Sequence, residues 1–127
     1  MTLGNSPVFG VLTQQPLQAY VSNYLSQSIS IIDVTSNQVV GTIAIPANPR
    51  KFAVTPDGSF AYVAVRNPDG VLLIDLRYET PAGWVADPNS TFDGPERVAL
   101  SPTTAVAYVT NFNAGTLFRS SISPRTP

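Results

Sequence analysis

Short apolar or alternating stretches, rich in valine, isoleucine, threonine, tyrosine and phenylalanine, recur along the whole chain. Glycine, proline, asparagine and aspartate separate them at intervals of roughly ten residues. Alternation of this kind is typical of strands, and no stretch has the apolar period of a long amphipathic helix. The pattern therefore predicts an all-β chain, with strands near 8–12, 18–22, 28–33, 38–43, 50–55, 60–65, 71–75, 83–86, 97–101, 106–110 and 116–121.

The phrase Ala-Tyr-Val occurs three times, at 19–21, 61–63 and 107–109, so successive copies begin 42 and 46 residues apart. A proline stands twelve residues before each copy, at Pro7, Pro49 and Pro95. A period of this size is typical of stacked supersecondary units. We expect one domain over 1–127, built from units at about 7–48, 49–94 and 95–127, the last of them incomplete.

The third unit departs from the plan of the first two. After the polar corner that follows Ala-Tyr-Val, the first unit has Ile-Ile-Asp ending at Asp33 and the second has Leu-Ile-Asp ending at Asp75. The third unit has Leu-Phe-Arg at the corresponding place. Such erosion is typical of a terminal or capping unit. We expect Asp33 and Asp75 to cap the turns that follow them, with metal binding as the alternative.

Several of these stretches carry a family resemblance. The phrases Ala-Tyr-Val-Ser-Asn at 19–23 and Ala-Tyr-Val-Thr-Asn at 107–111, with the runs 28–43 and 52–58, resemble the Tyr-Val-Thr-Asn repeat of bacterial and archaeal surface-layer β-propellers. The resemblance covers about residues 6–123. It implies about three four-stranded antiparallel blades of a partial propeller. It also implies an extracellular, cell-surface or periplasmic location, which the composition itself leaves unknown.

Three units leave two open sheet faces, because closed propellers need at least about four blades. An apolar sheet face is unfavourable in water. We therefore expect either a longer chain or a homo-oligomer. The favoured form is a head-to-tail dimer that closes a six-bladed ring, in which Met1, Thr2 and Leu3 of each copy lend an outer strand to the other.

Charge and composition narrow the possible partners. The net charge is −1, from 7 basic and 8 acidic residues, so we expect no nucleic-acid partner. No apolar run approaches the roughly 18 residues of a membrane span, so we expect no membrane insertion. Without cysteine or histidine the chain lacks disulfides, thiolate zinc sites and Ser-His-Asp or Cys-His catalysis. We predict no catalytic residue, no metal site and no cofactor.

Ligands of propellers usually meet the face that carries the corners and the entrances of the inner strands. This usual position of propeller ligands selects eight candidate ligand-binding residues. Four lie in the polar corners that follow Ala-Tyr-Val, namely Asn23, Arg66, Asn111 and Asn113, and four lie beside the prolines that begin the units, namely Arg50, Lys51, Glu96 and Arg97. We expect the charged residues beside the prolines to form a solvated salt-bridge cluster, with binding of an anion or a sugar acid as the alternative.

Two further features have competing interpretations. Asp69, Asp87 and Asp93 supply oxygen ligands that suit calcium, but their spacing matches no calcium loop and solvated turns are the alternative. Trp84, the only tryptophan, could stack on a glycan or pack on an outer strand.

These expectations favour a non-enzymatic scaffold or recognition module that binds a protein, a small molecule or a glycan at the channel face. The alternative is a fragment of a lactonase-like or quinoprotein-like enzyme. A third possibility is a structural piece of a larger propeller whose functional residues lie in other blades.

Overall fold

The computed structural model describes residues 1–14 and 16–121. In these ranges the chain forms eleven strands: β1 (Pro7–Gln14), β2 (Leu17–Asn23), β3 (Ser28–Asp33), β4 (Gln38–Ala44), β5 (Asn48–Val54), β6 (Phe60–Arg66), β7 (Gly70–Asp75), β8 (Thr80–Trp84), β9 (Pro95–Leu100), β10 (Val106–Asn111) and β11 (Thr116–Ser121). The all-β prediction is confirmed. The described part of the chain holds no helix that could span a membrane.

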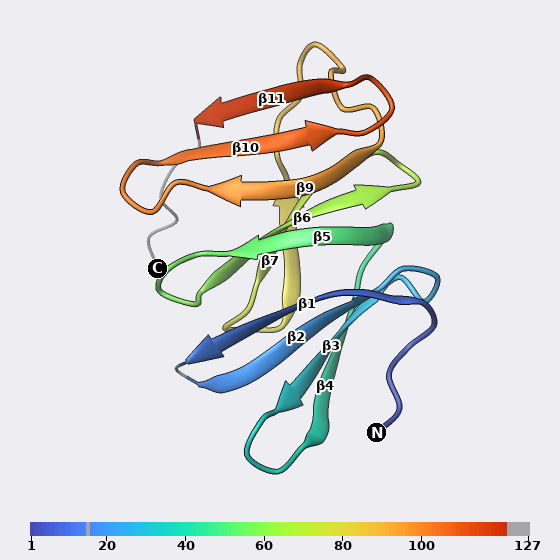
Figure 1. Cartoon of the computed structure of the whole chain (residues 1–127), viewed down its shortest axis with the longest axis vertical. Coiled ribbons are helices and arrows are strands. Elements are labelled where there is room, and N and C mark those ends of the chain that lie inside the picture. The colour runs from blue at the N-terminus through green and yellow to red at the C-terminus, as the bar shows by residue number, and fades with distance from the viewer. Residues whose placement is uncertain (15, 122–127) are drawn as a thin grey trace.

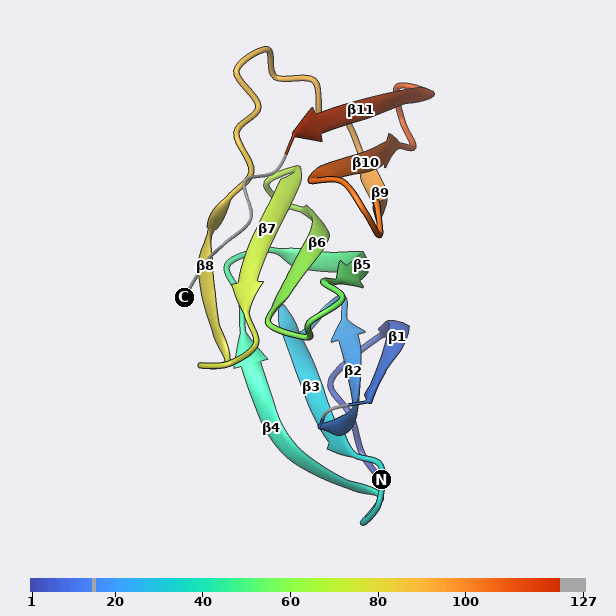
Figure 2. The ribbon, with the colours of Figure 1, turned by 90° about the vertical axis from the view of Figure 1, so that its left-hand side faces the viewer.

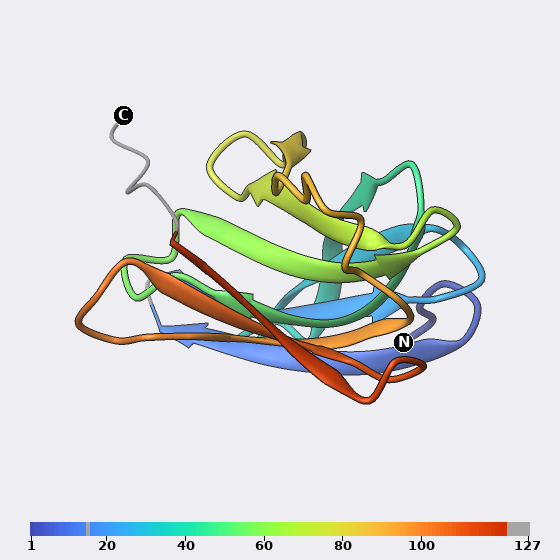
Figure 3. The ribbon, with the colours of Figure 1, turned by 90° about the horizontal axis from the view of Figure 1, so that it is seen from above.

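The strands form three antiparallel sheets, ordered β1-β2-β3-β4, β5-β6-β7-β8 and β9-β10-β11. The sheets follow one another along the long axis of the molecule (Figure 1), and they overlie one another when seen from above (Figure 3). Strands β1, β5 and β9 lie along one side of this stack, whereas β4 and β8 lie along the other (Figure 2). Residues 122–127, which we assigned to the third unit, lie outside the described residues.

One predicted strand was misplaced. Strand β8 spans Thr80–Trp84, whereas the sequence pattern predicted it near 83–86. Pro81 lies before the predicted strand and inside the observed one; β8 is an edge strand, where a missing backbone donor and a bulge are tolerated. The turn before it ends at Glu79 in a left-handed conformation (φ 56°), so the strand begins earlier than expected.

Each sheet carries two cross-strand rows that face opposite ways. Residues directly opposite each other on paired strands share one face of a sheet, and neighbours along a strand alternate between faces. We name the rows by their members from Ala-Tyr-Val. The alanine rows are Leu12–Ala19–Ile32–Val39, Val54–Ala61–Ile74–Pro81 and Leu100–Ala107–Ser120. The tyrosine rows are Val11–Tyr20–Ile31–Gly41, Ala53–Tyr62–Leu73–Gly83 and Ala99–Tyr108–Arg119.

The core consists of two clusters, each between neighbouring sheets. In the first, Tyr20 packs with Ala61 and Ile74. In the second, Tyr62 packs with Ala107. The tyrosine row of one unit therefore packs on the alanine row of the next, in both places. Burial of a large side chain contributes about 1.5–3 kcal/mol, so these rows hold the stack together.

Two of the three Ala-Tyr-Val tyrosines are buried in the single chain. Tyr20 and Tyr62 are 5% and 6% exposed, whereas Tyr108, at the same position of the third unit, is 40% exposed. Tyr108 differs because the described residues contain no further sheet to cover its row.

Candidate functional site

The charged residues beside the unit prolines meet at the start of the inner strands. Glu96 on β9 accepts hydrogen bonds from Arg50 Nε and Nη2 at 3.1 and 3.0 Å. It accepts a further one from Arg66 Nη2 at 2.9 Å, and Lys51 Nζ lies 3.8 Å away. Three cations of the second unit thus surround one carboxylate of the third, and we call this group the Glu96 cluster.

The cluster also sets the charge state of its carboxylate. Burial alone would raise the pKa of Glu96. The hydrogen bond and charge of Arg50, followed by the charges of Arg66 and Lys51, outweigh it and hold that pKa below its usual range. The Glu96 side chain is only 20% exposed, so these ion pairs are less screened by water than those on an open surface.

Arg97 is the predicted charged residue that stays outside the Glu96 cluster. Its guanidinium carbon lies 5.6 Å from the centre of the Phe9 ring. Phe9 in turn meets Phe52 edge to face, with ring centres 5.3 Å apart. Among the described residues, none forms an ion pair or a hydrogen bond with the Arg97 side chain. A guanidinium stacked on an aromatic face keeps its N–H edge available for an anion.

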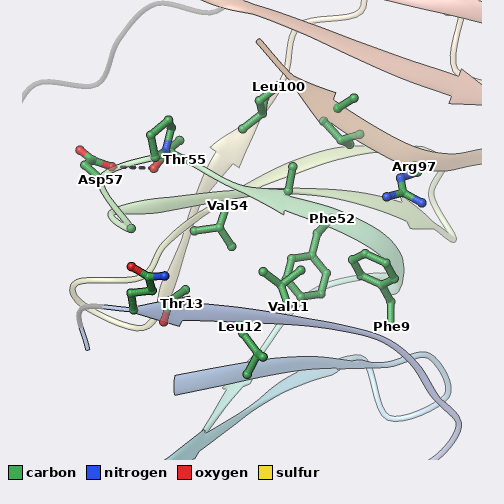
Figure 4. A pocket seen from close by; sticks show the side chains of 16 residues that line it. Phe9, Val11, Leu12, Thr13, Phe52, Val54, Thr55, Asp57, Arg97 and Leu100 are labelled. Atoms are coloured by element: carbon green, nitrogen blue, oxygen red, sulfur yellow. Dashed lines mark hydrogen bonds between the residues drawn. The ribbon is translucent and has the colours of Figure 1, made fainter. Parts of the chain in front are cut away.

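Arg97 lies at the edge of a groove that follows the three inner strands (Figure 4). The groove has a volume of about 800 Å³. Phe9, Val11 and Val54 give it an apolar floor. Thr55 and Asp57 lie toward the other end, away from Arg97 (Figure 4). The groove thus has the unpaired cation of Arg97 at one end, an apolar surface along its length, and the polar side chains of Thr55 and Asp57 at the other end.

The far end of the groove is a turn that the carboxylate of Asp57 holds in place. Asp57 Oδ1 accepts hydrogen bonds from Ser59 N at 3.0 Å and from Thr55 Oγ1 at 2.7 Å. The bond from the Ser59 amide, more than that from Thr55, lowers the pKa of Asp57. Asp57 is therefore ionised near neutral pH and gives this end a negative charge.

The corner asparagines form hydrogen bonds with neighbouring groups of the protein. Asn23 Nδ2 donates to Ser28 and Ser30, and Asn111 Nδ2 donates to Thr116. Both asparagines are buried. Asn23 Oδ1 has no hydrogen-bond partner among the described residues. Asn113 is exposed and donates to Asp93 at 3.4 Å.

The remaining acidic residues mostly bind backbone amides. Asp33 accepts from Ser36 N and Asp75 accepts from Arg77 N, which confirms the predicted capping role of both. Asp87 accepts from the amides of Thr91 and Phe92.

Asp69, in the corner of the second unit, and the tryptophan also have protein contacts. Asp69 accepts from Gly94 N at 2.8 Å. Among the described residues, no three acidic groups come together in a way that could hold a metal ion. Trp84 is half exposed, and its ring lies against Gly70, where an added Cβ would come within 3.1 Å of the ring.

Sequence reasoning named Arg97 but not the groove beside it. Phe9 and Phe52 stand in the apolar runs that follow Pro7 and Pro49. These runs lie on inner strands, so their place in the repeat is a signal for the groove. Which of their side chains face one another depends on how the sheets stack, and the pattern of a single strand does not contain that information.

Comparisons with solved structures agree on the fold. The chain is similar to Kuenenia stuttgartiensis hydrazine synthase, with 24% identity and a TM-score of 0.73 over 98% of this chain and 39% of that one. It is similar to a β-propeller domain from Myceliophteria thermophila, with 13% identity and a TM-score of 0.70 over 94% of this chain and 39% of that one. It is also similar to a putative 6-phosphogluconolactonase from Bacteroides fragilis, with 16% identity and a TM-score of 0.73 over 97% of this chain and 41% of that one.

The chain is therefore a partial β-propeller, and it spans about two fifths of the length of the structures it matches. No family model matches the chain, and no curated protein matches it in sequence. The Tyr-Val-Thr-Asn family remains a prediction. At these sequence identities the similarity to solved structures establishes the fold of the chain, but it assigns no functional residue.

The Glu96 cluster generates a prediction about acid stability. Because the pKa of Glu96 is lower in the folded chain, its contribution to stability is complete above the unfolded pKa of about 4.3 and is lost as the pH falls through the folded pKa. We expect Glu96→Gln to lower the free energy of unfolding by about 1–2 kcal/mol at neutral pH. The difference from wild type should shrink in acid, as urea unfolding across a pH series would measure.

Glu79→Gln is the control, because Glu79 is an exposed glutamate in the turn before β8. It should change the free energy of unfolding by less than about 0.5 kcal/mol. A constant difference between Glu96→Gln and wild type at every pH would contradict the role given to the ionised carboxylate.

Proposed function

We propose that this chain is a non-enzymatic scaffold or recognition module, which assembles head to tail into a closed ring and binds a ligand at its channel face. The observation that carries the proposal is the pair of uncovered sheet faces at the two ends of the stack. Leu12, in the alanine row of the first unit, is 71% exposed, and Tyr108, in the tyrosine row of the third, is 40% exposed. Rows of this kind are buried wherever a neighbouring unit is present.

Two copies of three units would make a six-bladed ring. In that ring Met1, Thr2 and Leu3 of one copy would add an outer strand to β11 of the other. Two features support an exchange between copies. The N-terminus and β11 lie at opposite ends of the stack (Figure 1), and β11 is an edge strand of its sheet. An unpaired strand edge is a template for strand addition.

The ligand site in this proposal is the groove of the inner strands. Arg97 provides a cation that no described side chain neutralises, above the apolar ring of Phe9. Asp57, which is ionised at the far end, disfavours a second negative charge there. The arrangement favours a small ligand with one carboxylate, such as a sugar acid, over a neutral sugar.

The alternative of a lactonase-like or quinoprotein-like enzyme fragment has less support. The putative 6-phosphogluconolactonase is only 16% identical to this chain, so it provides no catalytic residue to carry over. No arrangement of described residues favours a particular reaction. A recognition module, in contrast, requires only a binding groove and open sheet faces, and the chain has both.

The solution mass tests the assembly. Light scattering over a range of concentrations should give a discrete species of about twice the 13.5 kDa of one chain. Apolar burial drives this association, so the dimer should persist in high salt. A soluble monomer at every concentration would contradict the proposed ring.

Calorimetric titration with glucuronate, compared with glucose, tests the ligand site. Wild type should bind glucuronate in preference, and Arg97→Gln should weaken binding about tenfold or more, because a charge-assisted bidentate pair is lost. Arg97→Lys keeps the positive charge but cannot form two parallel hydrogen bonds to a carboxylate. Its affinity for glucuronate should therefore lie between those of wild type and Arg97→Gln.

Arg77→Gln is the matched control for the loss of one guanidinium. Arg77 pairs with Asp75 and does not line the groove, so binding should not change. Equal affinities of wild type and Arg97→Gln, or equal binding of the acid and the neutral sugar, would exclude Arg97 as the anchor.

A further inference from the structure

The two interfaces inside the chain use the same pairing of faces. At the first, the row of Tyr20 packs on the row of Ala61. At the second, the row of Tyr62 packs on the row of Ala107. The direction is the same at both, from the tyrosine row of one unit to the alanine row of the next. The chain therefore contains two examples of one heterologous interface.

Each end of the stack presents one half of that interface. The first unit ends in the alanine row of Ala19, in which Leu12 and Val39 are exposed. We call the face that carries this row the tail face. The third unit ends in the tyrosine row of Tyr108, and we call its face the head face. Leu117 lies on the head face as well, because it is opposite Thr110, two residues from Tyr108.

We infer that the head face of one copy docks on the tail face of a second copy, with the row of Tyr108 on the row of Ala19. This inference rests on the proposed assembly and specifies which surfaces meet. The second copy is the occupant that fits because the interface continues a pairing that occurs twice within the chain. A partner's Ala19 row would cover Tyr108 as Ala61 and Ala107 cover Tyr20 and Tyr62.

Charge argues against two head faces meeting each other. Arg119 is opposite Tyr108, so its side chain belongs to the head face, whereas the Arg97 guanidinium reaches back to Phe9 in the groove. Two head faces would bring two Arg119 side chains together, and the contact of like charges is unfavourable. Arg119 thus acts against the head-to-head pairing while leaving the head-to-tail pairing possible.

Arg119 takes the place that Ile31 and Leu73 occupy in the buried tyrosine rows. Its long side chain still allows docking, because the aliphatic stem can cover the partner's apolar row while the guanidinium at its tip stays solvated at the margin of the interface.

The tail face is open where docking requires it. The N-terminal segment contacts this face near Asn23, since an added Cβ on Gly4 would come within 2.8 Å of that side chain. Asn23 ends β2, whereas Ala19 and Leu12 lie toward the opposite end of the strands. Leu12 and Val39, the exposed members of the alanine row, are therefore left for a partner, whereas Ile32 is already buried within the chain.

An experiment with complementary variants separates the possible pairings. Tyr108→Arg blocks the head face and Leu12→Arg blocks the tail face; both side chains are exposed in the single chain, so each variant should fold. Each variant alone should dissociate at least about thirtyfold more readily than wild type, as expected for a hot-spot position. An equimolar mixture should recover a two-chain species, because one unaltered head meets one unaltered tail.

Leu25→Arg and Phe112→Arg are the matched controls. Both residues are exposed apolar side chains in corners, outside either row, so their variants should associate as wild type does. Circular dichroism and thermal unfolding confirm that every variant is folded.

The other outcomes overturn the inference in distinct ways. If Leu12→Arg alone stays dimeric, the copies pair head to head; if Tyr108→Arg alone stays dimeric, they pair tail to tail. If wild type is a dimer but the mixture stays monomeric, the assembly stands and the assigned faces are wrong. A monomeric wild type would remove the proposed assembly itself.

Discussion

The stack depends on one contact, the packing of a tyrosine row on the alanine row of the following sheet. Alanine leaves room on one face for the ring that the previous unit presents, and the valines beside it complete the apolar surface. Tyr20 and Tyr62 are buried in this way, together with the fully buried central strand β7. Each sheet is thin and has two faces, so it needs a neighbour on both sides. The middle sheet has two, and the outer sheets have one each.

This constraint connects the fold with the functional proposals. The same repeat that builds the core also leaves two unmatched faces at the ends of the chain. The repeat also places the unit prolines, and the charged residues after them, on neighbouring inner strands. There the Glu96 cluster links the second and third units, and Arg97 remains available at the groove. Assembly and ligand binding thus use different surfaces of the same stack.

Much of the architecture follows from local sequence signals. The Ala-Tyr-Val phrases, the alternating runs and the turn residues predicted the strands, because alternation and turn chemistry act over a few residues. Strand β8 was misplaced because Pro81 is unfavourable in a central strand but is tolerated at an edge. The meeting of Arg50 with Glu96 followed from their common position after the unit prolines.

Other features depend on contacts between distant residues. Arg97 stands at the same repeat position as Lys51, yet only Lys51 approaches Glu96, because side-chain reach across the sheets decides the partner. Asn23 and Asn111 suggested exposed corners, but their amides turn back onto serine and threonine hydroxyls. The groove arises only where three inner strands converge.

The central claim is that the row of Tyr108 is half of an interface, and the solvent exposure of that ring tests it most directly. Fluorine NMR of the chain labelled with fluorotyrosine would follow the rings of Tyr20, Tyr62 and Tyr108 during dilution. The account predicts that Tyr108 is protected in concentrated solution and becomes exposed on dilution, while Tyr20 and Tyr62 stay protected throughout. A Tyr108 ring that is equally exposed at every concentration would contradict it.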